Sequence, residues 1–291
     1  MESTMENLQE RLLEHLKKIV RERDPYYASG GHLFVREYIR SQLSQYGEVE
    51  VHEFDVRGNK HPNLILRLDP APSQKQWKGS KMELPILIGA HYDAVPGCVG
   101  ADDNATGVAV LLELARSLSA NPANYPIHLI AFDMEEYSLQ GSRAYVERLK
   151  QQNQKLRLMI SLEMLGYCDR TPNSQHYPKG LQYFYPNTGD FIGLIGNIQT
   201  IPDLIYLCHH MKTSVPCEWL PAGLRGLIVP DTRRSDHAPF WDAGYKAIMI
   251  TDTADMRNPH YHKSSDRLET LDLDFLTGVC KGLITGISHL L

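Results

Sequence analysis

A strand–helix–strand pattern lies between residues 84 and 136, and polar residues follow both of its strands. Two short apolar runs, residues 84–90 and 127–132, have the length and composition of buried strands. Residues 107–118 between them are rich in Ala, Val and Leu, as expected for a buried helix. This order predicts two parallel strands joined by a helix, which is the repeating unit of an open α/β sheet.

The polar residues that follow these strands include one imidazole and several carboxylates. His91 ends the first run, Asp103 lies in the segment GADDNATG, and Glu136 follows the second run. Singly, each such residue is more often a solvated loop, turn or surface residue than a ligand. Together they are expected at one edge of the sheet, where carboxylates repel each other unless a cation holds them. Zinc accepts both His nitrogen and carboxylate oxygen.

Two further segments extend this candidate metal site. Residues 156–162 form a third apolar run, which ends at Glu163, and the loop 258–266 offers His260 or His262. Two imidazoles and three carboxylates are enough to hold two divalent ions if one carboxylate bridges them. Glu135 lies beside a ligand and is not needed as one, so we expect it to be the general base. The predicted chemistry is metal-assisted hydrolysis of an acyl bond, with an amide as the leading case.

The rest of the chain predicts a single α/β domain over residues 1–291. Its central sheet is expected to be mixed and mostly parallel, with helices on both faces. Helices over 4–23 and from 31 to 47 come first and are expected to pack on this domain. Residues 48–56 alternate between apolar and polar side chains, which predicts a half-buried antiparallel strand near an edge. We expect surface loops over 69–82 and 219–235, the second long enough to have a function if ordered.

Composition narrows the class of protein. The hydrophobic fraction is 42% and the charged fraction 22%, and the net charge is −5. This balance disfavours nucleic acid as a partner, and no apolar run approaches the length of a membrane span. The N-terminus has no basic region followed by an apolar stretch, and the five cysteines show no paired short spacing. We therefore expect a cytoplasmic protein with reduced thiols. Nothing in the sequence indicates the oligomeric state.

Six motifs, in this order, resemble the co-catalytic di-zinc aminopeptidase family of metallopeptidase clan MH. They are HYDAVPG, GADDNATG, DMEEYSLQGS, SLEMLGY, SDHAPFWDAG and YHKSSD. The resemblance covers about residues 84–291, and the family also includes glutamate carboxypeptidases and glutaminyl cyclases. It implies a zinc-peptidase (phosphorylase/hydrolase-like) fold, two zinc ions or other divalent ions, and removal of N-terminal residues from a peptide substrate.

The resemblance also implies a role for each matching residue. The implied zinc ligands are His91, Asp103 as the bridging carboxylate, Glu136, Glu163 and His262. Many members have Asp at the position of Glu163, so this chain differs there by one methylene. Glu135 falls on the general base, Tyr261 on a tyrosine that stabilises the oxyanion, and Asp93 on a carboxylate that orients the first histidine. A cis peptide is also implied between Asp103 and Asn104.

The substrate-binding residues are predicted less sharply. Glu163 and Glu135 offer part of an acidic pocket for a free amino terminus. Tyr137, Met164, Leu165, Tyr167 and Phe191 fit either a pocket or the core, and Asp236 and His237 fit either a substrate contact or a helix start lining the cleft. Arg225, Arg233 and Arg234 fit a substrate carboxylate, although a solvated loop face is the commoner role for such residues.

Three other functions remain open at this point. A zinc carboxypeptidase or deacylase also opens with HxDxVP, but such chains carry an inserted lid domain for which this chain has no room. A glutaminyl cyclase-like acyltransferase uses one zinc and lacks the first histidine, whereas His91 is present. A non-catalytic binding module would have lost ligands, whereas every ligand position is filled here.

Overall fold

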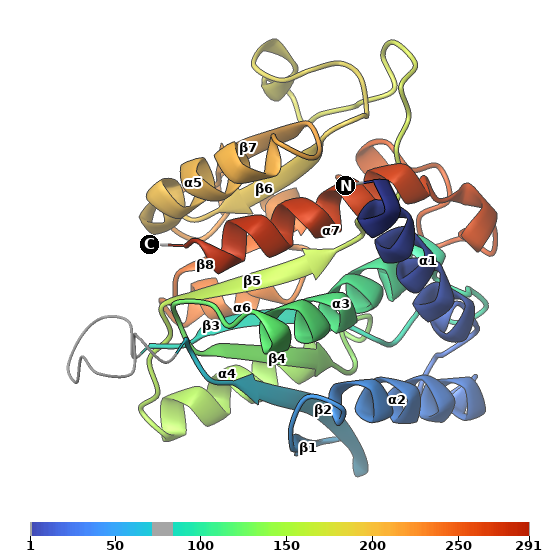
Figure 1. Ribbon diagram of the computed structural model, residues 1–291, viewed down its shortest axis with the longest axis vertical. Coiled ribbons are helices and arrows are strands. Elements are labelled where there is room, and N and C mark those ends of the chain that lie inside the picture. The colour runs from blue at the N-terminus through green and yellow to red at the C-terminus, as the bar shows by residue number, and fades with distance from the viewer. Residues whose placement is uncertain (1, 72–83, 291) are drawn as a thin grey trace.

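The protein folds around one eight-stranded sheet with helices on both sides, as the computed structural model in Figure 1 shows. The structure describes residues 2–71 and 84–290, with side chains from residue 7 onward. The strands are β1 (Val49–Val56), β2 (Asn59–Leu68), β3 (Ile86–His91), β4 (Ile127–Phe132), β5 (Leu158–Glu163), β6 (Ile192–Gly196), β7 (Cys217–Pro221) and β8 (Ala247–Thr251). The helices are α1 (Glu2–Ile19), α2 (Ser29–Leu43), α3 (Gly107–Ala120), α4 (Gln140–Gln151), α5 (Ile201–Met211), α6 (His237–Asp242) and α7 (Leu273–Ser288).

The strand order is β1-β2-β4-β3-β5-β8-β6-β7. Strands β4, β3, β5 and β8 are parallel and form the centre, whereas β1, β2 and the β6–β8 pair add antiparallel contacts. Every residue of β3, β4 and β5 is buried, which explains why their sequences are continuous apolar runs. The predicted mixed, mostly parallel α/β sheet is confirmed, and so is the alternating edge strand β1.

Two helix layers bury the two faces of the sheet. On one face α3 packs on β3, β4 and β5, and α1 and α7 pack against α3 (Figure 1). On the other face α4 and α6 cover β1, β2, β5 and β8. Alternate residues of β3 therefore belong to different cores: Ile86 and Ile88 lie in one, and Leu87 lies in the other.

The structure differs from the sequence prediction in the segment 219–235. Its first residues belong to β7, an edge strand that pairs in parallel with β6. This strand is only five residues long and partly buried, so it lacks the apolar run that marks the central strands. Most of the predicted 69–82 loop, from residue 72, lies outside the described residues. In the described part of the chain, no helix is long and apolar enough to cross a bilayer.

Candidate active site

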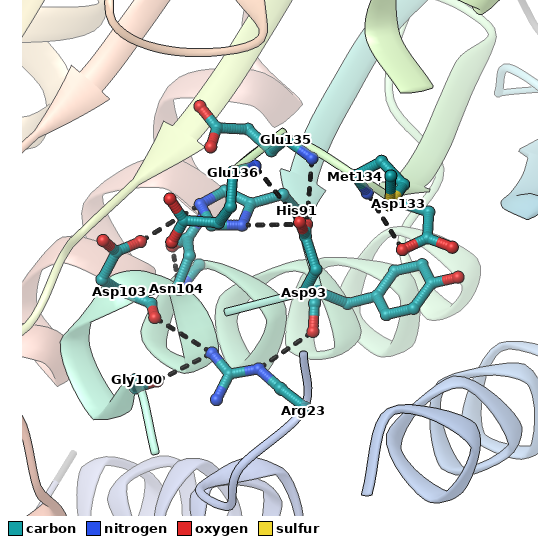
Figure 2. A network of polar contacts seen from close by, with 12 residues as sticks. Arg23, His91, Asp93, Gly100, Asp103, Asn104, Asp133, Met134, Glu135 and Glu136 are labelled. Carbon is teal, nitrogen blue, oxygen red and sulfur yellow. Dashed lines mark hydrogen bonds and ion pairs between the residues drawn. The ribbon is translucent and has the colours of Figure 1, made fainter. Parts of the chain in front are cut away.

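Histidines and carboxylates from five segments converge at the carboxyl edge of the central strands, and Figure 2 shows His91, Asp103, Glu135 and Glu136 among them. His91 is the last residue of β3, and Glu163 is the last residue of β5. Asp103 lies in the turn that leads into α3, and Glu135 and Glu136 follow β4. The loop after β8 brings a second histidine to the same place. The fold thus gathers residues that lie up to 171 positions apart in the sequence.

The carboxylate of Asp103 lies between the two histidines. Its Oδ1 is 3.2 Å from His91 Nε2, and its Oδ2 is 3.1 Å from His262 Nε2. A second carboxylate accompanies each imidazole: Glu163 Oε1 is 3.5 Å from His91 Nε2, and Glu136 Oε2 is 3.2 Å from His262 Nε2. The geometry therefore has two imidazole–carboxylate groups that share Asp103.

His260 and His262 were both candidates from the sequence, and the structure distinguishes between them. The His260 ring turns toward Ser265, with 3.0 Å between Nδ1 and the hydroxyl oxygen. Only His262 of the two forms ion pairs with the carboxylates in the described structure.

Several buried polar atoms of this cluster have no hydrogen-bonding partner among the described residues. They are both ring nitrogens of His91, Asp103 Oδ1 and Glu136 Oε1; the carboxylate oxygens near the His91 ring lie at ion-pair distances of 3.2 to 3.5 Å but outside hydrogen-bond geometry. Buried polar groups in native proteins are nearly always hydrogen-bonded, so such atoms require an explanation. His91, Asp103 and Glu136 present ligand atoms within 4.8 Å of one another, and so do His91, Glu135 and Glu163. This donor set of imidazole nitrogen and carboxylate oxygen fits zinc.

Crowding and burial make the cluster electrostatically unfavourable without a cation. Burial and the neighbouring Asp103 together raise the pKa of Glu136 to about 7. Burial likewise raises the pKa of Glu135 well above its usual range, with Glu163 and Glu136 adding to the effect. Divalent cations would relieve this repulsion and keep the carboxylates ionised.

Asp93 connects the first histidine to the loop that carries the glutamates. Its two carboxylate oxygens accept hydrogen bonds from the backbone N–H groups of Glu135 and Glu136, each at 3.1 Å. His91 Nδ1 lies 3.5 Å from Asp93 Oδ1. Asp93 is fully buried, so these contacts are screened from water. One side chain therefore ties the position of His91 to that of the two glutamates.

The turn around Asp103 is held by residues to which the sequence analysis gave no role. Asn104 Oδ1 accepts from the N–H groups of Gly107 and Met164, at 3.1 Å each, and its Nδ2 donates to Leu162 O at 2.8 Å. Asp266 accepts from the N–H of Asp103 at 3.1 Å. Asn104 and Asp266 lie within motifs quoted above, so their position was a signal, but their contacts became visible only in the fold. The Asp103–Asn104 peptide is cis, as the family resemblance implied.

Tyr261 lies beside this cluster under the side chain of Arg234. Arg234 Nη2 donates to the Tyr261 hydroxyl at 3.1 Å, and its guanidinium lies 5.3 Å from the centre of the ring. Arg234 Nη1 pairs with Asp255 at 3.0 Å. Burial raises the pKa of Tyr261, so its hydroxyl stays protonated. Because a guanidinium can only donate, the hydroxyl proton of Tyr261 is free for another acceptor.

A cleft opens next to the cluster, with Glu163, Arg234 and Tyr261 in its wall. Strands β6, β7 and β8 and the loops that flank them form the rest. Most of its other side chains are aromatic or aliphatic, among them Tyr177, Leu181, Tyr185, Phe191, Trp219, Leu220, Met249 and Met256. The cleft thus combines an apolar wall with one end at the carboxylates.

Of the residues predicted to bind substrate, Glu163 lines this cleft, as does Phe191, which fitted either pocket or core. Tyr137 instead donates its hydroxyl to Asp24 at 2.6 Å, and Met164 is fully buried. Among the described residues, the lining of this cleft includes neither Tyr137 nor Met164. It also does not include Tyr167, Asp236 or His237. The physical reason is that most of the wall comes from β6, β7, β8 and the loops around them, whereas the motifs mark the strand ends that hold the ligands.

Asp236 and His237 are both fully buried at the start of α6. Burial raises the pKa of Asp236 to about 7 and lowers the pKa of His237 to about 3. His237 Nε2 lies 2.7 Å from the carbonyl oxygen of Thr232, and its ring packs edge-on against Trp241. These contacts are those of a core histidine, so the structure favours packing over a substrate contact for His237.

Comparison with known proteins agrees with this geometry. Residues 74–198 match the model of "Peptidase family M28". The chain is 34% identical to the Escherichia coli K12 protein "Uncharacterized protein YfbL" over 264 residues, which cover 86% of this chain and 77% of that protein. The chain belongs to peptidase family M28. The predicted membership of the co-catalytic zinc aminopeptidase family is confirmed as membership of this peptidase family.

Two further similarities concern proteins named as aminopeptidases. "Aminopeptidase YwaD" of Bacillus subtilis strain 168 is 30% identical over 195 residues, or 66% of this chain and 38% of that protein. The structure of the LapA aminopeptidase of Legionella pneumophila superposes with a TM-score of 0.73 at 18% identity, covering 99% of this chain and 75% of that one. The second likeness establishes the shared fold.

Proposed function

We propose that the protein is a two-zinc aminopeptidase that removes apolar N-terminal residues from peptides. The observation that carries the proposal is the position of Asp103, whose carboxylate faces an imidazole–carboxylate group on each side. His91, Asp103 and Glu163 would hold one ion, and Asp103, Glu136 and His262 the other. Similarity to the aminopeptidase YwaD supports the same activity. Other divalent cations also suit these ligands, so metal supply contributes to the choice.

In the proposed mechanism, bound zinc supplies the Lewis acidity that activates water and polarises the scissile carbonyl. Glu135 accepts the proton of the attacking water and later gives it to the leaving amine. Its position suits this role, because Glu135 precedes the proposed ligand Glu136 and its carboxylate lies within 4.8 Å of ligand atoms of His91 and Glu163. Tyr261 donates its free hydroxyl proton to the carbonyl oxygen as that oxygen becomes negative. Asp93 orients His91 through Nδ1.

The shape and charge of the cleft favour a substrate with a free amino group and an apolar side chain. Glu163 lines the cleft on the side of the cluster, and its carboxylate, with that of Glu135, attracts an ammonium group. The aromatic wall that includes Phe191 and Trp219 can bury a large apolar side chain. We also propose a cytoplasmic location, since all five cysteines are free and four of them are buried.

The test compares hydrolysis of aminoacyl anilides with that of their N-acetyl counterparts by the zinc-loaded protein. The proposal predicts cleavage of free-amine substrates, fastest for leucine and aromatic residues, and loss of that cleavage in Glu135→Gln. Glu147→Gln is the matched control, because Glu147 pairs with Lys150 on the exposed face of α4. Hydrolysis of only blocked or C-terminally free substrates would instead support a deacylase or carboxypeptidase. Cyclisation of N-terminal glutamine without hydrolysis would support a cyclase.

A further inference from the structure

A single arginine from outside the motifs lies beneath the metal-binding loops. Arg23 follows α1 in a segment without regular structure, and its side chain is fully buried. Arginine is almost never fully buried unless it is paired. The residues that match the family model begin at 74, so this segment lies outside them. We infer that Arg23 and its neighbour Asp24 are positioning residues that hold the two proposed zinc-binding loops in register.

Backbone carbonyl oxygens satisfy the whole guanidinium of Arg23. Its Nε donates to Tyr92 O at 2.9 Å, and its Nη2 donates to Gly100 O at 2.8 Å and Asp103 O at 3.1 Å (Figure 2). Its Nη1 donates to the carbonyl oxygens of Val99 and Arg21. Arginine has five N–H donors, and each has one of these five acceptors. Four of the five acceptors lie between His91 and Asn104, so one side chain fixes both ends of this ligand-bearing segment.

The backbone of this segment leaves space for the guanidinium only because residue 100 is glycine. Gly100 has a φ of +53°, in the left-handed region that favours glycine. A Cβ at this position would lie 2.8 Å from Arg23 Nη2 and 2.1 Å from Asp103 O. The close approach of Arg23 to Asp103 therefore depends on a specific residue of the GADDNATG motif.

Asp24 makes the corresponding contact with the loop that carries the glutamates. Its Oδ2 accepts a hydrogen bond from the hydroxyl of Tyr137 at 2.6 Å. Tyr137 directly follows Glu136 in this loop. Its Oδ1 accepts from the N–H groups of Tyr26 and Tyr27, so the carboxylate is itself held in place. Adjacent residues of one segment thus contact the two loops that contribute Asp103 and Glu136. This arrangement gives Tyr137 a positioning role in place of the predicted substrate contact.

The positive charge of Arg23 complements the carboxylates that surround it. Burial lowers the pKa of Arg23, whereas the carboxylates of Asp103, Asp266, Asp93 and Glu136 raise it. A guanidinium nonetheless stays protonated in proteins. It therefore supplies a permanent positive charge behind a cluster of acids, without occupying any of the atoms that face the proposed ions.

The experiment replaces Arg23 by Lys, Met and Ala in the full-length protein. Zinc affinity is measured by competition with a chelator, kcat and KM with a free-amine anilide, and stability by thermal unfolding. Met and Ala are expected to weaken zinc binding by about 10- to 100-fold and to lower kcat with little change in KM. Lys should keep more affinity than Met, and millimolar guanidinium should restore part of the zinc affinity of the Ala variant.

Leu283→Ala is the control, because Leu283 is a buried residue of α7 that takes no part in the site. It should lower the melting temperature without changing zinc affinity or gaining from guanidinium. Asp24→Asn and Tyr137→Phe, which remove little volume, test the second contact and are expected to lower kcat and zinc affinity in the same direction. They also provide the test if the Arg23 variants do not fold.

The inference rests on the proposed function only in assuming that these loops bind zinc. Arg23, Asp24 and Tyr137 variants that unfold earlier but keep wild-type zinc affinity and kcat, as Leu283→Ala should, would overturn it. A wild-type protein that binds no zinc would instead overturn the proposed function.

Discussion

At the scale of single residues, Tyr261 and Arg234 act as a pair in the proposed mechanism. Because Arg234 donates to the Tyr261 oxygen, the tyrosine can only offer its own proton to the substrate. Tyr261→Phe is expected to lower kcat by about 10²- to 10³-fold with a small effect on KM. Arg234→Gln should lower kcat less, and it should add little in the Tyr261→Phe background. Steady-state kinetics of the two single variants and the double variant measure this coupling.

Arg233→Gln is the control for this comparison of single and double variants. Arg233 forms an ion pair with Asp242 and donates a hydrogen bond to the carbonyl oxygen of Arg225. This variant should leave kcat unchanged. Fully additive losses in Tyr261→Phe and Arg234→Gln would show that Arg234 acts on the substrate directly, for example on a peptide carboxylate.

His237 gives a prediction about stability and pH. Burial lowers its pKa to about 3, far below the value near 6.5 of an unfolded histidine. Between these values only the unfolded state takes up the proton, so the free energy of unfolding falls as the pH drops from about 6.5 toward 3. The loss amounts to at most about 1.4 kcal/mol per pH unit. Denaturant unfolding from pH 7 to 4.5 should show a shallower decline in His237→Gln than in the wild type.

Leu283→Ala serves as the comparison for this experiment, because it removes a buried apolar side chain and no titratable group, so it should lower stability without changing the slope. Equal slopes for His237→Gln and the wild type would mean that His237 is not held neutral in the core.

At the scale of secondary structure elements, the position of each ligand follows from the strand that precedes it. Central strands are buried on both faces, so their sequences are apolar runs, and the polar residues at or just after the end of each run mark the edge of the sheet. His91, Glu136 and Glu163 could be predicted for this reason. The partly buried edge strand β7 has no such run, so the wall that it contributes to the cleft was not predictable from local pattern.

A substitution of Trp219 in β7 tests whether the apolar wall of the cleft selects the substrate side chain. Replacing Trp219 with Ala removes a large apolar surface from the cleft and should lower kcat/KM for leucine and phenylalanine anilides by about 10-fold. The alanine anilide should change less, because its side chain is too short to fill the space. Equal losses for all three substrates would indicate a general disturbance, and Trp219 would then have no part in selecting the side chain.

At the scale of the whole molecule, the N-terminal segment was predictable as helices but not as part of the site. The apolar stripe of α1 and its position before the sheet indicate packing, and α1 does pack on α3 and α7. In the sequence, Arg23 is one of several basic residues near the end of that helix, and nothing distinguishes it from the others. Four of its five carbonyl contacts arise only when residues about 70 to 80 positions apart are brought together. Likewise, no local pattern links Asp24 to Tyr137.

The proposed site requires Asp103 to contribute to the binding of both metal ions. The most direct test is the number of zinc ions per chain, measured by elemental analysis after zinc loading and removal of excess metal, in the wild type and in Asp103→Asn. We predict close to two ions per chain in the wild type and a loss of tight binding at both sites in Asp103→Asn, with circular dichroism confirming that the variant is folded. One ion or none in the wild type, or two ions retained by a folded Asp103→Asn, would contradict the proposed site.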